Sequence, residues 1–354
     1  MSGASALTAT GDGSQTQAWN KPGRPASTVG SWLPDGPLGE SLSAGLSRVE
    51  DALHASAVSD SPFVAEAAAH LMTAGGKRFR PVLALLAAQL GDADSEEVVS
   101  AAVVCELTHL ATLYHDDVMD EAAVRRGAPS ANSRWSNSIA ILTGDFLFAR
   151  ASDLLADLGP EAVRIQARTF ERLVTGQIRE TVGPVEGEDP IEHHLSVLAD
   201  KTGSLVATSA RFGATFAGVD PAVVEDLTSY AEEIGVAFQL ADDLIDIVSE
   251  AGTSGKSPGT DLREGIATLP VLLARAGDDP AEARLRELVA GPITDDAEHA
   301  EALALLRGSA SLARATEVLH SYADRARARL GRVPEGEVRE ALSALCDYVV
   351  TRSA

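Results

Sequence analysis

The chain has 354 residues, of which 45% are hydrophobic and only 4% aromatic. Asp and Glu total 52 against 29 Lys and Arg, which gives a net charge of −23. That balance argues against general nucleic-acid binding and against adsorption to anionic membranes, because both need a basic face. Cys105 and Cys346 are too few for a disulfide framework, so we expect a cytoplasmic protein. We find no apolar run of the length of a membrane span and no secretory signal, so we expect no transmembrane segment.

The N-terminal segment differs in composition from the rest of the chain. Residues 1–38 are rich in Gly, Ser, Thr and Pro, which predicts a flexible arm of no catalytic importance. From Leu38 onward the sequence consists of long Ala- and Leu-rich stretches with helical spacing. We therefore predict a single large catalytic domain over residues 39–354.

Start and stop signals place several helices. Asp220-Pro221 and Asp279-Pro280 each pair an N-cap residue with proline at the first helical position. The predicted helices cover residues 62–74, from about 81, from about 95 to at least 114, 220–249, from about 280, 295–307, 309–330 and 335–352. No alternating strand pattern of useful length appears. The sequence therefore predicts an all-α fold of ten or more helices.

The most informative segment ends the helix predicted from about residue 95. Its last residues include Asp116, Asp117 and Asp120, and the first and third of these share a helix face at spacing i, i+4. Three carboxylates this close repel one another unless a cation lies between them. Oxygen ligands of this kind suit Mg²⁺, which binds a few carboxylates together with substrate phosphates. A single such string in so acidic a chain could equally be a solvated helix face.

A second copy of the pattern makes the solvated face the weaker interpretation. Asp242, Asp243 and Asp246 repeat the spacing in a separate helix, among apolar residues where unneeded carboxylates are costly to bury. Two such helices facing each other would hold several Mg²⁺ ions and one diphosphate. Clustered divalent metals neutralise a diphosphate and make it a better leaving group.

Two basic segments supply the positive charge that anionic substrates need. One is Gly75-Gly76-Lys77-Arg78-Phe79-Arg80-Pro81, in which the glycines let the backbone approach a phosphate, and the other is Val124-Arg125-Arg126-Gly127. Either segment alone could be an ordinary surface patch. Three weaker features point the same way: Lys201-Thr202-Gly203, Gly255-Lys256 and Gly176-Gln177, the last of which we expect at the end of a helix.

The order of these segments resembles the trans-isoprenyl diphosphate synthases, also called polyprenyl synthetases, over about residues 70–275. GGKRFRP, HxxxxxxDDVMD, RRG, Gly144-Asp145, GQ, KTG, FQLADDLID, GK and Thr268-Leu269-Pro270 follow one another with the spacing of that family. The resemblance implies an all-α fold of mostly antiparallel helices around a central cavity, and a homodimer. It also implies an enzyme that adds isopentenyl diphosphate to an allylic diphosphate with several Mg²⁺ ions.

The resemblance also implies roles for matching residues. The diphosphate of isopentenyl diphosphate would be held by Lys77, Arg80, His109 and Arg126. The allylic diphosphate would be held by Arg125, Lys201, Thr202, Gln239 and Lys256. The main Mg²⁺ ligands would be Asp116, Asp120 and Asp242, with support from Asp117, Asp243 and Asp246. Lys201, Thr202 and Gln239 would stabilise the allylic cation left by the departing diphosphate.

The residues below the first Asp motif bear on product length. Ala111 and Thr112 lie about one turn before Asp116, and Thr108 and Cys105 lie further down. Small side chains here would leave a tunnel open for a growing tail, and the segment resembles that of long-chain synthases which make quinone side chains. The motif also lacks the two extra residues typical of bacterial farnesyl diphosphate synthases. We predict a hexaprenyl-to-decaprenyl product with Phe170 as the tunnel floor, although Phe170 could equally be ordinary core.

Three alternatives stay open at this point. A shorter-chain enzyme such as a geranylgeranyl diphosphate synthase would share every motif. A class I terpene cyclase would share the first Asp motif but would not need the second or the GGKRFRP segment. A non-catalytic prenyl-binding subunit would lack one motif, whereas the catalytic half of a two-component synthase would look the same in sequence.

Overall fold

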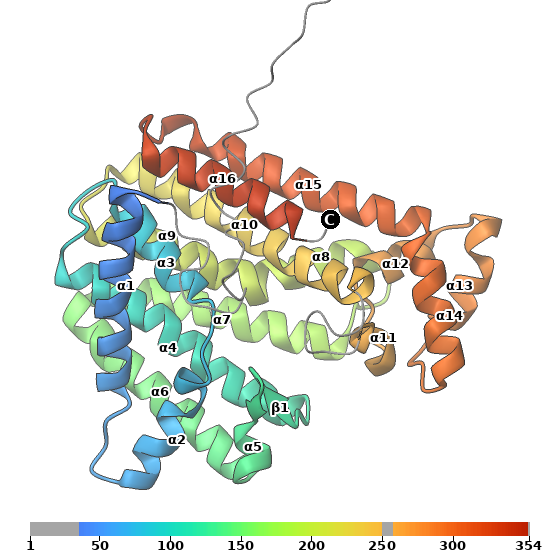
Figure 1. The fold of residues 1–354 in the computed structure, drawn as a ribbon, viewed down its shortest axis with the longest axis horizontal. Coiled ribbons are helices and arrows are strands. Elements are labelled where there is room, and N and C mark those ends of the chain that lie inside the picture. Colours follow the sequence, from blue (N-terminus) through green and yellow to red (C-terminus); the bar gives the residue numbers. More distant parts are fainter. Residues whose placement is uncertain (1–34, 250–257, 353–354) are drawn as a thin grey trace, which may run out of the picture.

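The computed structural model describes residues 35–249 and 258–352, which form a helical body with one small hairpin (Figure 1). The first half contains α1 (Pro37–Ser56), α2 (Pro62–Thr73), α3 (Phe79–Ala88), α4 (Glu96–Met119), β1 (Val124–Arg125), β2 (Ala128–Pro129), α5 (Ala131–Arg134), α6 (Asn137–Leu158) and α7 (Pro160–Val182). The second half contains α8 (Pro190–Leu198), α9 (Ser204–Phe216), α10 (Pro221–Val248), α11 (Thr260–Glu264), α12 (Leu269–Ala276), α13 (Ala283–Leu288), α14 (Asp296–Arg307), α15 (Ala310–Arg329) and α16 (Glu337–Thr351). The all-α prediction is confirmed.

Capping chemistry sets the helix starts where the sequence predicted them. Ser95 accepts a hydrogen bond from the backbone N–H of Val98 and opens α4, and Asp220 caps α10 ahead of Pro221. Asp279 also acts as a cap, but the chain first makes a 3₁₀ turn over Pro280–Glu282 before α13 begins. The Gly176-Gln177 pair was expected at a helix end, but α7 continues to Val182, five residues beyond Gln177.

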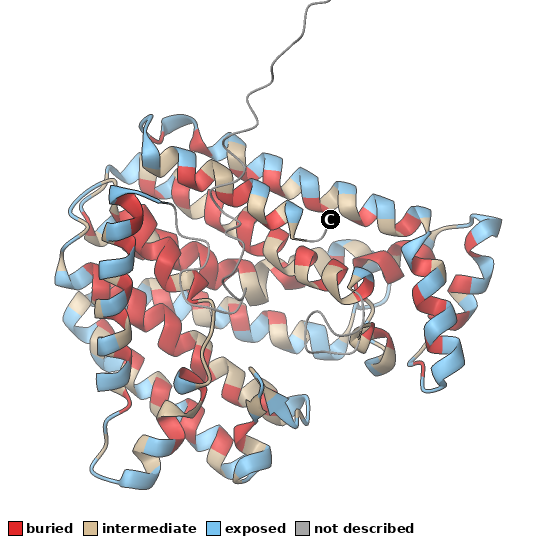
Figure 2. Cartoon of the chain, viewed as in Figure 1, coloured by how far each residue is buried: buried red, intermediate tan, exposed pale blue. Residues whose placement is uncertain are grey.

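Helix α4 is the central element of the main core. It packs against α1, α3, α6 and α9, and its inner residues from Val98 to Ala111 are buried almost without interruption (Figure 2). By length and composition α4 could cross a membrane, contrary to the expectation that no segment reaches that length, but 72% of its apolar window is buried inside the fold. A helix that is surrounded by other helices is apolar on all its faces, and this accounts for the apolar composition of α4.

A second, smaller core lies at one end of the molecule. It is built from α11, α12, α13 and α14 around residues such as Leu285, Ile293 and Leu306 (Figure 1). Helix α10 joins the two cores, since its first three-quarters pack into the main core and Ile247 packs into the smaller one. The predicted boundary at residue 38 lies one residue inside α1, and residues 1–34 of the predicted arm lie outside the described residues.

Candidate active site

The first Asp motif ends α4. The Asp116 carboxyl is partly buried, and burial raises its pKa to about 6, an effect that nearby Asp120 and Glu180 strengthen and Lys201 opposes. Asp117 is fully buried, and its Oδ1 accepts a hydrogen bond of 2.6 Å from Arg125 Nε. Asp120 is the exposed C-cap residue, with its Oδ2 4.0 Å from Arg125 Nη2. Asp116 and Asp120 therefore offer oxygens to a ligand, while Asp117 is engaged by Arg125.

The second Asp motif lies in the last turns of α10. Asp242 is paired with Arg352, which follows the last turn of α16. Asp243 is buried, which raises its pKa to about 8, and its Oδ1 accepts a 3.0 Å hydrogen bond from Gln239 Nε2. Asp246 Oδ2 accepts a hydrogen bond of 3.3 Å from the backbone N–H of Asp261. Gln239 and Asp243 thus act as one hydrogen-bonded unit at the base of this motif.

Glu180 of α7 brings the two motifs into one region. Its carboxylate contributes to raising the pKa of Asp116 and also that of Asp243, so it lies near both motifs. Its Oε2 accepts a hydrogen bond from Lys201 Nζ. Sequence reasoning missed Glu180, although it is one turn of helix after Gly176, on the same face. The helices α4, α7 and α10 therefore present carboxylates to a common space beside Lys201.

The donor set of this region fits Mg²⁺. Among the described residues no three His, Cys, Asp or Glu side chains are arranged as a ready-made metal site. Mg²⁺, however, is usually held by one or two carboxylates together with substrate phosphates. Asp117 Oδ2 is buried without a hydrogen-bond partner, and burial raises the pKa of Asp116, as expected where a cation would stabilise the charged carboxylates. Asp116, Asp120 and Asp242 are the residues that would hold it.

A cluster of buried positive charge lies beside the first motif. The pKa of His109 is lowered well below its usual value by burial, and the surrounding guanidinium groups of Arg80, Arg126, Arg78 and Arg125 add to the effect. Arg126 donates from Nη1 to the backbone oxygens of Leu71 and Gly75. The imidazole is therefore neutral, and three of the four predicted isopentenyl-site residues, Arg80, His109 and Arg126, are brought together.

The fourth residue of that group, Lys77, lies toward the second motif. Its Nζ is 5.5 Å from the centroid of the Phe238 ring. Burial lowers its pKa, Arg352 lowers it further, and Asp242 opposes both. Arg352 also stacks over Phe238, with Cζ 4.3 Å from the ring centroid. Sequence reasoning missed Arg352, because it belongs to no motif and is far in sequence from the other site residues.

Gly76 and Arg78 have structural roles in the basic segment that the sequence did not indicate. A Cβ on Gly76 would lie 2.8 Å from Arg126 Nη1, so this glycine makes room for a guanidinium group. Arg78 has a left-handed backbone, with φ of 48°. Its buried side chain is held by Glu50 of α1 at 2.6 Å and by Glu106 of α4 at 3.1 Å. Arg78 is thus a structural anchor that ties the loop to two helices.

The hairpin of β1 and β2 presents Arg125 and Arg126. The turn residues Arg126 and Gly127 both have positive φ, 54° and 78°, as a two-residue hairpin turn requires. His70 of α2 fastens the hairpin through a 2.8 Å contact between its Nε2 and the backbone oxygen of Pro129. Arg125 was predicted to hold the allylic diphosphate, and in this structure its guanidinium pairs with Asp117. Lys256, from the same predicted group, lies outside the described residues.

The predicted chain-length residues lie along α4 and α7. Ala111 is fully buried, and the Thr112 hydroxyl donates to the backbone oxygen of His109 at 2.8 Å. Thr108 is also buried, and its hydroxyl accepts a 2.8 Å hydrogen bond from Gln166 Nε2 of α7, which sequence reasoning missed. The Phe170 ring lies 4.5 Å from that of Phe148 of α6, between ring centroids. Phe148 in turn lies 5.7 Å from His115, next to Asp116.

Fold and site define a class of protein: an all-α enzyme with two Asp motifs near the ends of α4 and α10, both close to Glu180 of α7, and a buried arginine cluster beside the first motif. The chain matches the polyprenyl synthetase family over residues 61–306. It is 52% identical over 330 residues to a nonaprenyl diphosphate synthase of Mycobacterium tuberculosis, covering 93% of this chain and 98% of that protein.

Solved structures agree with this assignment. A geranylgeranyl pyrophosphate synthase of Corynebacterium glutamicum superposes with a TM-score of 0.82 at 46% identity, covering 90% of this chain and 98% of that one. A decaprenyl diphosphate synthase of Rhodobacter capsulatus gives a TM-score of 0.81 at 33% identity, covering 89% and 98%. The chain belongs to the polyprenyl synthetase family and is a prenyltransferase.

Proposed function

We propose that this prenyltransferase adds isopentenyl diphosphate head-to-tail to an allylic diphosphate and makes a long-chain all-trans polyprenyl diphosphate, as for a quinone side chain. The observation that carries the proposal is the convergence of both Asp motifs on Glu180 and Lys201, beside the Arg80, His109 and Arg126 cluster. The high identity to a nonaprenyl diphosphate synthase supports the long product.

Two separate groups of residues would bind the two substrates. Arg80 and Arg126, with His109 neutral between them, would hold the diphosphate of isopentenyl diphosphate by charge and hydrogen bonds. Lys201, Thr202 and Gln239 would hold the allylic diphosphate and place oxygens and dipoles near the allylic cation. Bound Mg²⁺ would neutralise the diphosphate as a leaving group. The double bond of isopentenyl diphosphate then attacks the cation, and a proton is lost from the adduct.

Product length distinguishes the long-chain enzyme from its shorter-chain alternative. Relatives named for geranylgeranyl and for nonaprenyl or decaprenyl products share this fold, so length depends on the tunnel and not on the fold. Ala111, five residues before Asp116, supports a long product because its side chain is small, whereas a bulky aromatic at this position would block the tail. We propose that Phe170, whose ring packs against that of Phe148, forms the tunnel floor.

The test uses purified protein with Mg²⁺, farnesyl diphosphate and labelled isopentenyl diphosphate, with products read by mass spectrometry. We expect a ladder that ends in one long polyprenyl diphosphate. A product that stops at geranylgeranyl diphosphate would support the shorter-chain alternative. Absence of condensation by folded protein would contradict the proposal for the chain alone and favour the catalytic half of a two-component synthase.

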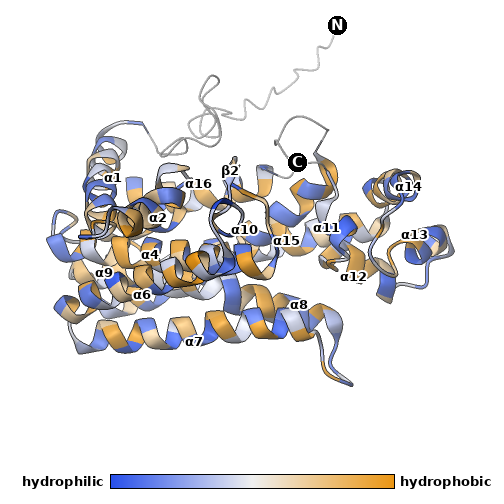
Figure 3. Ribbon diagram, turned by 90° about the horizontal axis from the view of Figure 1, so that it is seen from below, coloured by the Kyte–Doolittle hydropathy of each residue, from blue (hydrophilic) through white to orange (hydrophobic). Residues whose placement is uncertain are grey.

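We further propose that the protein is a homodimer in the cytoplasm. Helices α6 and α7 expose large apolar side chains, namely Ile141, Leu142, Val163, Val174, Ile178 and Val182. Figure 3 colours several stretches of both ribbons as hydrophobic. Val174, Ile178 and Val182 follow one another at i, i+4 spacing, so they form one stripe along α7. Ile178→Asp should give a monomer in light scattering coupled to size-exclusion chromatography, with Val58→Asp, at an exposed apolar residue outside α6 and α7, as the control. A dimeric Ile178→Asp protein would contradict this interface.

A further inference from the structure

Two of the residues proposed to hold the allylic diphosphate, Lys201 and Thr202, lie on a local irregularity of the backbone. Residues Ala199–Gly203 form a π-helical turn between α8 and α9, and this turn contains Lys201 and Thr202. A π-helical turn has one more residue per hydrogen-bonded ring than an α-helix, and such turns are frequent at functional sites. Since the turn departs from regular helix geometry, its position depends on the side chains that hold it.

Helix α7 supports the turn from one side. A Cβ on Gly176 would lie 2.8 Å from the backbone nitrogen of Lys201 and 3.0 Å from Cβ of Asp200, so the turn rests directly on this glycine. Arg172 and Arg179 stand at i−4 and i+3 from Gly176, on the same face of α7. They therefore flank the point of contact.

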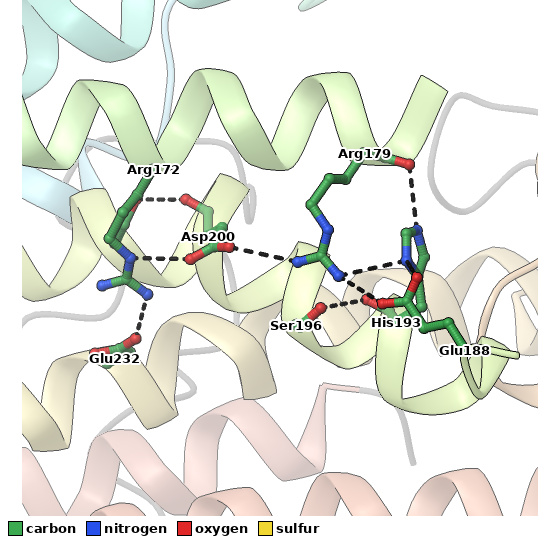
Figure 4. Close-up of polar contacts among 8 residues, drawn as sticks. Arg172, Arg179, Glu188, His193, Ser196, Asp200 and Glu232 are labelled. Carbon is green, nitrogen blue, oxygen red and sulfur yellow. Dashed lines mark hydrogen bonds and ion pairs between the residues drawn. The ribbon is translucent and has the colours of Figure 1, made fainter. Parts of the chain in front are cut away.

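Both arginines hold the carboxylate of Asp200, the residue before Lys201 (Figure 4). Arg172 Nε lies 2.9 Å from Asp200 Oδ1, and Arg179 Nη1 lies 3.8 Å from Asp200 Oδ2. Arg179 is itself held by Glu188 at 2.8 Å. The Asp200 carboxylate thus lies between two guanidinium groups of α7. These two ion pairs restrict movement of the π-helical turn relative to α7.

The same network reaches α10, the helix with the second Asp motif. Arg172 Nη2 lies 2.6 Å from Glu232 Oε1, so a single arginine joins the π-helical turn to α10 (Figure 4). The backbones also meet here, since a Cβ on Gly235 would lie 2.8 Å from Cα of Gly203. Asp242 follows Glu232 by ten residues, about 15 Å along the helix. The network therefore fixes the turn relative to both helices that approach the site.

We propose that Asp200 is a positioning residue, whose carboxylate, held by Arg172 and Arg179, keeps Lys201 and Thr202 directed at the two Asp motifs. The proposal rests on the proposed function, because Lys201 and Thr202 have their roles from it. The side chains of Arg172 and Asp200 are 41% and 24% exposed, so their ion pair contributes little to overall stability. A displacement of about 1 Å at a reacting group, by contrast, can lower the rate about a hundredfold.

The test compares variants in steady-state kinetics with farnesyl diphosphate, isopentenyl diphosphate and Mg²⁺. Asp200→Ala should lower kcat/KM for farnesyl diphosphate about tenfold to a hundredfold, with KM for isopentenyl diphosphate unchanged. Glu232→Gln should show a smaller loss of the same kind. Glu233→Gln is the matched control, because Glu233 is the next residue of α10 and pairs with Arg325 of α15 at 2.8 Å, away from the turn.

The outcomes separate this inference from the proposed function. Unchanged farnesyl diphosphate kinetics in Asp200→Ala, together with impaired Lys201→Ala, would overturn the positioning role and leave the proposed function standing. An equal loss in Glu233→Gln, or a loss for both substrates alike in Asp200→Ala, would also overturn it, since general structural damage would explain the result. Normal kinetics in Lys201→Ala would overturn the proposed role of Lys201, and the inference with it.

Discussion

The Asp motifs of α4 and α10 share one spacing but differ in how their middle carboxylate is neutralised. Asp117 is fully buried beside the guanidinium of Arg125, 2.6 Å from its Nε, which opposes the rise in pKa that burial causes. Asp243 is buried beside the neutral amide of Gln239, and burial raises its pKa to about 8. The ion pair therefore favours the anionic form of the first carboxylate, while burial favours the protonated form of the second. Two motifs of the same spacing thus differ in the charge state that their neighbours favour.

The largest expected effect is a loss of activity, and it tests the Mg²⁺-binding role that we propose for both motifs. Asp116→Ala and Asp242→Ala should each lower kcat about a thousandfold or more, because each removes a proposed ligand of the ions that neutralise the leaving group. The measurement is condensation of farnesyl and isopentenyl diphosphates at saturating Mg²⁺. Asp153→Ala, at an exposed residue of α6, serves as the control and should retain full activity. Activity above about a tenth in either motif variant would contradict the metal role.

The next effect concerns the helices below the motifs. Ala111 and Ala237 each precede the first carboxylate of their motif by five residues, and both are fully buried. Ala111→Phe should shorten the product sharply, whereas Ala237→Phe should lower stability by overpacking and leave product length unchanged. Phe170→Ala should lengthen the product. Mass spectrometry measures the product length of each variant. Equal shortening by Ala111→Phe and Ala237→Phe would show that the tail does not follow α4 alone.

A moderate effect separates the two middle carboxylates. Asp117→Asn leaves Arg125 without its buried partner and should lower the free energy of unfolding by about 2 kcal/mol, less than for a fully buried pair since Arg125 is 26% exposed. Asp243→Asn replaces a mostly neutral acid by a neutral amide that still accepts from Gln239, so we expect a change within about 1 kcal/mol. Urea unfolding at pH 7 without Mg²⁺ measures both. Equal losses would mean that both carboxylates are charged in the folded protein.

The smallest effect is the loss of stability expected when Asp242, the first carboxylate of the second motif, loses its partner Arg352. Arg352 is paired with Asp242, whose side chain is 40% exposed, so Arg352→Ala should lower metal-free stability by about 1 kcal/mol or less. Arg352→Lys keeps the charge and should recover part of that loss. Thermal unfolding without Mg²⁺ provides the measurement. A loss well above this value would show that stacking of Arg352 on Phe238, not the ion pair, holds the end of α16.

Much of the site could be predicted because its members lie in short segments with fixed helical spacing. Asp116 and Asp120 share a face at i, i+4, and Arg125 and Arg126 follow Asp120 by five and six residues. Glu180, Glu106 and Arg352 could not be found in this way. Each acts across a distance of many residues in sequence, and a lone charged residue on an amphipathic helix is indistinguishable from a solvated one.

The sequence by itself determined the helical class, the main helix starts and the family, because caps, prolines and repeated Asp spacings act over a few residues. Only the tertiary structure decided which charges are paired. It directs Arg125 to Asp117, gathers four arginines around His109, and holds Asp200 between Arg172 and Arg179. Burial and distance set the charge state of a carboxyl group, and both depend on helices brought together from distant parts of the chain.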